Sequence, residues 1–142
     1  MRKGTPAEAA KIAEAKRRKR DIATIIVAIL LIPAIIWGVQ IIKKEAEIKA
    51  VKTQMNSIYT GAKLFTHDRG YQPKGVDQLE DLGLVVMQEK LLGKWTFKMT
   101  WPQTIEAAAI ENGQESTDKK IVFKIPEELF YGYGCPLHGE TW

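Results

Sequence analysis

A thiol and an imidazole lie three residues apart at Cys135 and His138, near the C-terminal end of the chain. This pair could supply a nucleophile with its base, or two of the ligands of a zinc ion. A structural zinc site needs four ligands and haem attachment needs two cysteines, whereas this chain has a single cysteine. We therefore predict a capped or buried thiol in a loop, with neither metal binding nor catalysis at Cys135.

Side chains that could act as a general acid and base occur at two other places. His67, Asp68 and Arg69 are consecutive and follow an expected helix, which is typical of a solvated turn. Glu80 and Asp81 are adjacent, so on a helix they point apart and do not form a carboxylate dyad. The glycines are scattered at turns and form no phosphate-binding loop. The chain is therefore predicted not to be an enzyme and to bind no cofactor and no metal.

The chain that carries these residues also contains one long uncharged segment. Residues 22–42 contain no charged side chain, and as a helix they would span roughly 30 Å, which is the thickness of the hydrocarbon core of a bilayer. Lys43 and Lys44 follow where a cleaved signal peptide would have small residues, so we expect the anchor to be retained. The sequence predicts a single-pass membrane protein with a transmembrane helix at 22–42.

The residues before this segment form a basic tail. Residues 1–21 contain eight basic and three acidic side chains, and basic flanks resist translocation, so the N-terminus is expected in the cytoplasm. Thr5 as N-cap, Pro6 at the first helical position and Glu8 three residues after Thr5 form a capping box, which predicts that the tail is a helix. The chain after residue 42 contains thirteen basic and fourteen acidic side chains.

The positive charge is concentrated next to the predicted membrane helix. Five consecutive basic residues are expected to contact anionic lipid at the cytoplasmic face: Lys16, Arg17, Arg18, Lys19 and Arg20. No aromatic side chain interleaves with them, so the run does not resemble a nucleic-acid-binding module, and no nucleic acid is expected as a partner.

Residues 43–142 have the patterns of an α+β domain. The helical pattern shows apolar side chains at alternating spacings of three and four, which predicts one amphipathic helix continuing from the transmembrane helix: Ile48, Val51, Met55, Ile58, Ala62 and Phe65. Apolar residues alternate with polar ones over 95–101, a second strand is expected at 104–111, and a third lies around 121–125 after a turn-rich segment at 112–118. We predict a three-stranded antiparallel sheet covered by the amphipathic helix.

This order of elements resembles the type IV pilins. The motif Asp-x-Gly-Tyr-x-Pro follows the long helix at 68–73, and the whole is most similar to the major pseudopilin of type II secretion. The resemblance implies a pilin-like fold over about residues 22–125. Two pilin features differ: the residues after Arg2-Lys3-Gly4 are charged instead of apolar, and the apolar segment contains no acidic residue. We therefore expect a pilin-like domain on an unprocessed anchor.

Aromatic residues indicate where partners could dock. Trp37 lies near the outer end of the predicted membrane helix, where aromatic side chains serve as interface anchors. Residues 129–142 are rich in aromatics and glycines without periodicity, and Phe130, Tyr131, Tyr133 and Trp142 are candidate docking residues. The alternative is that Phe130, Tyr131 and Tyr133 close the edge of the sheet.

Two functions are compatible with these features. The first is an accessory structural subunit of a larger bacterial membrane protein complex, whose partners are other membrane subunits. The alternative is a pseudopilin or minor pilin-like component of a type II secretion or type IV pilus system, which would self-associate through its membrane helix. Either places the chain in the bacterial inner membrane, with the C-terminal domain periplasmic or otherwise extracytoplasmic.

Overall fold

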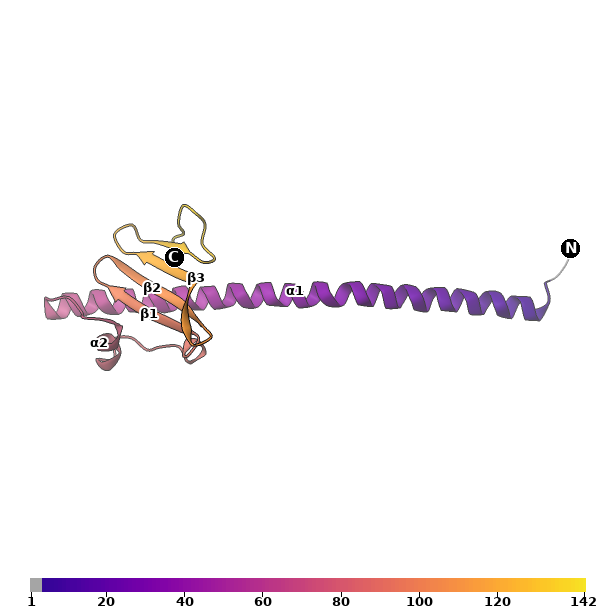
Figure 1. Ribbon diagram of the computed structural model, residues 1–142, viewed down its shortest axis with the longest axis horizontal. Helices are drawn as coiled ribbons and strands as arrows, with labels where there is room; N and C mark the ends of the chain where they lie inside the picture. The colour runs from indigo at the N-terminus through magenta and orange to yellow at the C-terminus, as the bar shows by residue number, and fades with distance from the viewer. Residues whose placement is uncertain (1–3) are drawn as a thin grey trace. The chain divides into compact units, whose positions relative to one another are not determined.

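The computed structural model describes residues 4–142, which form helices and one antiparallel sheet (Figure 1). In chain order these are the α-helices α1 (Pro6–Arg69) and α2 (Val76–Asp81), the 3-10 helix η1 (Glu89–Leu91), and the strands β1 (Trp95–Thr100), β2 (Thr104–Glu111), β3 (Gln114–Lys124) and β4 (Leu129–Gly132). The chain divides into two compact parts, the first ending at Lys43 and the second comprising Lys44–Trp142. The α+β class predicted from the sequence is confirmed.

Helix α1 begins where the capping box predicts. The backbone N–H of Thr5 donates to Oε2 of Glu8 at 3.3 Å, and the carbonyl of Thr5 accepts from the N–H of Glu8 at 2.9 Å. The helix continues through Pro33. Within residues 22–42 the large apolar side chains are exposed; the first of them, Ile22, is 55% exposed and the last, Ile42, is 66% exposed. Among residues 4–142, α1 is the one helix long and apolar enough, by length and composition, to cross a membrane.

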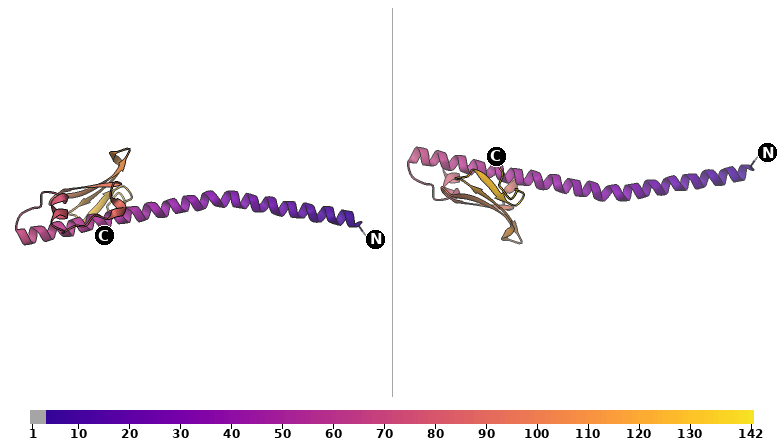
Figure 2. Two further views of the ribbon diagram at one scale, coloured as in Figure 1. Left: turned by 90° about the horizontal axis from the view of Figure 1, so that it is seen from below. Right: turned by 90° about the horizontal axis from the view of Figure 1, so that it is seen from above.

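The C-terminal part of α1 has a buried stripe. All six residues of the predicted stripe are buried: Ile48, Val51, Met55, Ile58, Ala62 and Phe65. Four of these six, Val51, Met55, Ile58 and Ala62, have no exposed surface. The six residues form one hydrophobic core with side chains of the sheet, including Ile105, Phe123 and Phe130. Figure 2 shows the sheet lying along one side of this part of α1. The predicted amphipathic helix is thus confirmed.

The prediction of three strands is wrong, because the sheet has four in the order β1-β2-β3-β4. All neighbours are antiparallel, and β4 pairs with β3 through contacts such as Lys124 with Leu129 and Ile121 with Gly132. The sequence of β4 does not alternate between apolar and polar residues, so it lacks the pattern of a half-buried strand. Its pairing comes from its position after a tight turn that follows β3.

The turn between β2 and β3 is shorter than the sequence indicated. Asn112 and Gly113 both have positive φ, at 52° and 77°, which is the requirement of a two-residue type I′ hairpin turn. The polar residues 114–118, expected to belong to the turn, instead form the start of β3. Their side chains are mostly exposed, which explains why the segment resembles a loop in composition.

The segment between α2 and η1 crosses α1 and is bound to it by one buried polar side chain. Gln54 is 1% exposed; its Nε2 donates to the carbonyl of Val86 at 3.3 Å and its Oε1 accepts from the N–H of Gln88 at 2.9 Å. Gly61 lies under the same segment, because a Cβ at this position would come within 2.8 Å of Cγ2 of Val85. This extended segment thereby completes the core on the side of α1 next to β1.

Candidate docking surfaces

The thiol of Cys135 is half-buried and hydrogen-bonded to the backbone. It lies in the loop after β4, and its Sγ is 3.8 Å from the carbonyl oxygen of Tyr133, to which it donates. Burial raises the pKa of the Cys135 thiol, and this outweighs the opposing effect of nearby Lys52. A reactive cysteine needs the opposite shift, since the thiolate is the nucleophile. His138 lies on the same loop with an exposed side chain.

The other candidate acid and base residues are dispersed on the surface. His67, Asp68 and Arg69 form the last turn of α1, not a turn after it, and all are exposed. Glu80 and Asp81 end α2 and are also exposed. Within residues 4–142, no three His, Cys, Asp or Glu side chains lie close enough to hold a metal ion.

The basic run and Trp37 are exposed along the first part of α1. The five residues of the basic run all project from the helix into open space: Lys16, Arg17, Arg18, Lys19 and Arg20. Trp37 is 70% exposed, which is unusual for the largest apolar side chain in a folded protein. Both features are therefore available for contacts outside the chain.

The aromatic residues of β4 divide between the core and the surface. Phe130 has no exposed surface and belongs to the core, which agrees with the alternative interpretation that it closes the sheet. Tyr131 lies on the opposite face; its hydroxyl donates to Oε2 of Glu127 at 2.7 Å, and this hydrogen bond raises the pKa of Tyr131. Tyr133 is half-buried beneath Lys44, whose Nζ is 4.6 Å from the ring centroid.

Trp142 covers the aromatic end of the core while keeping half of its surface exposed. Its ring centroid is 4.5 Å from that of Phe130 and 4.8 Å from that of Phe123, and it stacks on Tyr59 at 6.4 Å with an interplanar angle of 17°. The side chain is 51% exposed. A tryptophan fixed on one face and open on the other resembles the aromatic anchors that dominate binding energy at protein interfaces.

A groove of about 490 Å³ lies beside Trp142, between α1 and the C-terminal residues. Its floor includes Ile48, Phe130 and Gly134, and one wall carries the ion pair between Lys52 and Glu140. The sequence interpretation missed Lys52, Glu140 and Tyr59. A second helical spacing would have indicated the α1 wall of this groove, since its residues 45, 49, 52 and 56 follow one another at intervals of three or four.

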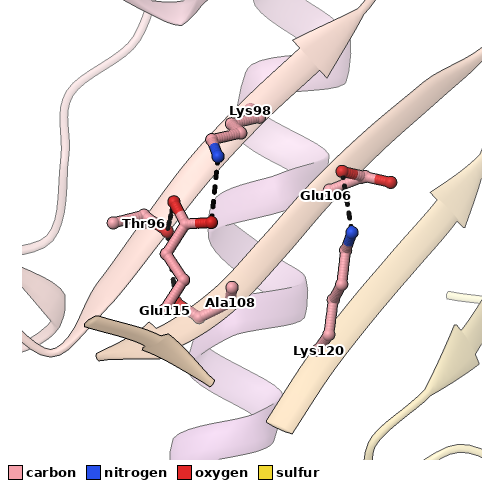
Figure 3. Close-up of polar contacts among 6 residues, drawn as sticks. All are labelled: Thr96, Lys98, Glu106, Ala108, Glu115 and Lys120. Atoms are coloured by element: carbon pink, nitrogen blue, oxygen red, sulfur yellow. Dashed lines mark hydrogen bonds and ion pairs between the residues drawn. The ribbon is translucent and has the colours of Figure 1, made fainter. Parts of the chain in front are cut away.

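The outer face of the sheet, which points away from α1, carries charges that pair with one another (Figure 3). Nζ of Lys98 lies 2.9 Å from Oε2 of Glu115, and Nζ of Lys120 lies 3.1 Å from Oε2 of Glu106. Thr96 also donates its hydroxyl to Glu115 at 3.0 Å. A neutralised, exposed face of this kind is typical of a solvated surface and contrasts with the apolar groove beside Trp142.

Comparisons of the chain with protein-family models, with curated proteins and with solved structures found no match in any of the three.

Proposed function

We propose that the chain is a non-catalytic single-pass membrane protein that acts as an accessory structural subunit of a larger bacterial membrane protein complex. The observation that carries the proposal is the exposure of residues 22–42, whose apolar side chains have no cover within residues 4–142. An isolated helix with apolar residues on all sides is unstable in water and needs lipid or other apolar helices around it.

The orientation follows from the exposed basic run. Lys16, Arg17, Arg18, Lys19 and Arg20 precede the apolar segment directly, and such side chains are retained in the cytoplasm, where they are attracted to anionic lipid. The domain Lys44–Trp142 would then lie outside the inner membrane, in the periplasm or another extracytoplasmic space.

A structural role is favoured by the kinds of surface that the domain presents. Its titratable residues are dispersed, the pKa of its single thiol is raised, and the groove beside Trp142 carries an exposed tryptophan next to apolar side chains. Trp142 and Trp37 are the anchors we assign to contacts with other membrane subunits, one in the domain and one in the membrane helix.

The organisation of the helix and sheet supports the alternative, a pseudopilin or minor pilin-like component of a type II secretion or type IV pilus system. A single helix has an exposed apolar N-terminal part and a C-terminal part that packs on an antiparallel meander, and the segment at 68–73 begins in its last turn. In this alternative, copies of the chain would associate through residues 22–42.

The test is to extract the full chain from its native membrane in mild detergent and to measure the intact masses of everything that remains bound. Foreign subunits in stoichiometric amounts support the accessory role, and association mainly with further copies supports the alternative. A chain recovered alone as a monomer, or in the soluble fraction, contradicts both.

Two matched variants locate the contact surface. Trp142→Ser should reduce recovery of the partner subunits while the chain remains in the membrane. Val86→Ser removes another exposed apolar side chain, 79% exposed and outside the groove, and should leave the partners bound. Equal recovery from both variants would contradict a role for Trp142 in docking.

A further inference from the structure

Two loops of the domain carry exposed leucine side chains that are not part of the core. Leu137, in the loop 132–139, is 101% exposed, and Leu92, in the loop 89–94, is 58% exposed. The loops lie at the same end of the sheet, because one precedes β1 and the other follows β4 in an antiparallel meander of four strands. In Figure 1 this is the end of the domain from which the β2–β3 hairpin also extends.

The loop 132–139 is attached firmly to the first residues of the domain. The ring of Tyr133 lies 4.6 Å from Nζ of Lys44, and Gly134 is packed on Ile48 so closely that a Cβ would come within 2.4 Å of Cδ1. Phe130 and Glu140 close the base of the loop with two backbone hydrogen bonds, of 2.8 and 3.0 Å. Leu137 is therefore exposed on a loop whose base and first residues are fixed to the domain.

The loop 89–94 is attached to the same part of α1. Nε1 of Trp95 donates to Oε1 of Glu47 at 2.8 Å, and the carbonyl of Lys94 accepts from the N–H of Ile110 at 2.8 Å. Leu92 lies between Lys90 and Lys94, which are both exposed and form no ion pair among residues 4–142. An apolar tip flanked by lysines is complementary to a lipid surface, where acyl chains lie beneath phosphates.

Covalent attachment limits how far these loops can be from the bilayer. Lys44 and Glu47 follow Ile42 by two and five residues, so at most about 7 and 18 Å of chain separate them from the end of the apolar segment, whatever angle the two parts adopt. The polar layer on each side of a bilayer is roughly 5–8 Å thick. The residues that hold both loops are therefore confined to the membrane surface or its immediate vicinity.

We propose that the domain rests on the outer surface of the membrane through the loops 132–139 and 89–94. Leu137 and Leu92 enter the boundary between headgroups and acyl chains, and Lys90 and Lys94 contact lipid phosphate. The proposal rests on the proposed membrane anchor at 22–42, and it adds a second lipid contact on the opposite side of the bilayer from the basic run.

The test uses the full chain in nanodiscs of phosphatidylcholine and phosphatidylglycerol. In a Cys135→Ser background, single cysteines are introduced as Leu137→Cys, Leu92→Cys, Val86→Cys or Ile29→Cys and labelled with a fluorophore that responds to polarity. Lipids with a quencher on the acyl chain then report contact. Val86 is the matched control, because it is 79% exposed and is held to Gln54, twelve residues beyond Ile42.

The expected result is a blue-shifted emission and about twofold or greater quenching at positions 137 and 92, as for side chains inserted to the depth of interfacial residues, with little change at 86. Quenching at position 29 shows that the membrane helix is inserted. If 29 is quenched while 137 and 92 behave as 86 does, the proposal is wrong and the anchor stands. If 29 is not quenched, the proposed anchor fails, and this lipid contact fails with it.

Discussion

Residues 22–42 and residues 48–65 belong to the same helix, α1, but they are stabilised by different surroundings. In the first segment the large apolar side chains are exposed, and charged residues are absent. In the second, the stripe from Ile48 to Phe65 is buried against the sheet or the segments that flank it. Helical propensity alone does not distinguish the two segments, because both are helical.

The two segments differ in what covers their apolar side chains. The first offers apolar surface in every direction, so it requires an apolar solvent that is not part of the chain. The second offers one apolar side and a polar remainder, so the chain can supply the cover from its own sheet. Because both segments contain isoleucine, glutamine and glycine, the same substitution can be made in each and the results compared.

The largest difference is expected for isoleucine. Ile58→Ala removes a side chain with no exposed surface from the core, and should lower the free energy of unfolding of the domain by about 2–5 kcal/mol. Ile35→Ala shortens a side chain that is 61% exposed, and should change the free energy of unfolding of the domain by less than about 0.5 kcal/mol. Urea unfolding of the full chain in mild detergent, followed by near-UV circular dichroism of the domain tryptophans, measures both.

Equal effects of the two isoleucine variants would contradict the division of α1 into two surroundings. A large effect of Ile35→Ala would mean that residues 22–42 contribute to the core of the domain. A small effect of Ile58→Ala would mean that α1 does not pack on the sheet as described.

A smaller difference is expected for glutamine. Gln54→Leu keeps the volume but leaves the N–H of Gln88 without its acceptor, and should destabilise the domain by about 1–3 kcal/mol. Gln40→Leu, in the exposed apolar segment, should leave the unfolding of the domain unchanged and should not reduce membrane insertion. Hydrogen exchange at the amide of Gln88 gives an independent measurement, since it should accelerate only in Gln54→Leu.

Glycine gives the third matched pair. A Cβ at Gly61 would lie 2.8 Å from Cγ2 of Val85 and 3.0 Å from the carbonyl oxygen of Leu84, whereas nothing lies within 4 Å of a Cβ at Gly38. Gly61→Ala should destabilise the domain by about 1 kcal/mol, because overpacking exceeds the gain in helix propensity. Gly38→Ala should be neutral. The same unfolding experiment compares them, and a stabilised Gly61→Ala would contradict the close approach of the 84–88 segment.

The parts of the fold that were predicted from the sequence are those with a strong local pattern. The capping box at Thr5 marks the start of a helix. The stripe from Ile48 to Phe65 has the period of a helix, and the alternation from Trp95 to Met99 has the period of a strand. Strand β4 could not be predicted this way, since its two central aromatics face opposite sides of the sheet and its formation depends on pairing with β3. The start of β3 was missed because its polar residues resemble a turn.

The candidate site was less predictable, because exposure is a property of the folded chain. Trp142 was identified from residue type alone, and the structure shows it half exposed on an aromatic cluster; Phe130, chosen for the same reason, is buried. The ion pair of Lys52 with Glu140 joins residues 88 positions apart. No spacing rule connects such residues before the sheet brings the C-terminal segment back to α1.

The smallest expected effect concerns charge, which residues 22–42 lack and the β-sheet carries at its surface. The hydrogen bond from Lys119 lowers the pKa of Glu111, and the hydrogen bond from Lys98 lowers the pKa of Glu115, both from an ordinary value of 4.5. A carboxyl whose pKa is lower in the folded state binds protons more weakly there than in the unfolded state. Its stabilising contribution is present above pH 4.5 and is lost as the pH falls through the folded pKa.

The double variant Glu111→Gln and Glu115→Gln should therefore be less stable than the parent chain above pH 4.5, and the two should converge below it. Because both carboxylates are exposed, the difference should be small and should decrease further in 1 M salt, where surface charges are screened within about 3 Å. Urea unfolding of both chains between pH 3 and pH 7, at low and high salt, measures it. A difference that persists unchanged at low pH would show that the two side chains stabilise the hairpin by packing, and that the β-sheet surface, like the apolar segment of α1, gains nothing from ionisation.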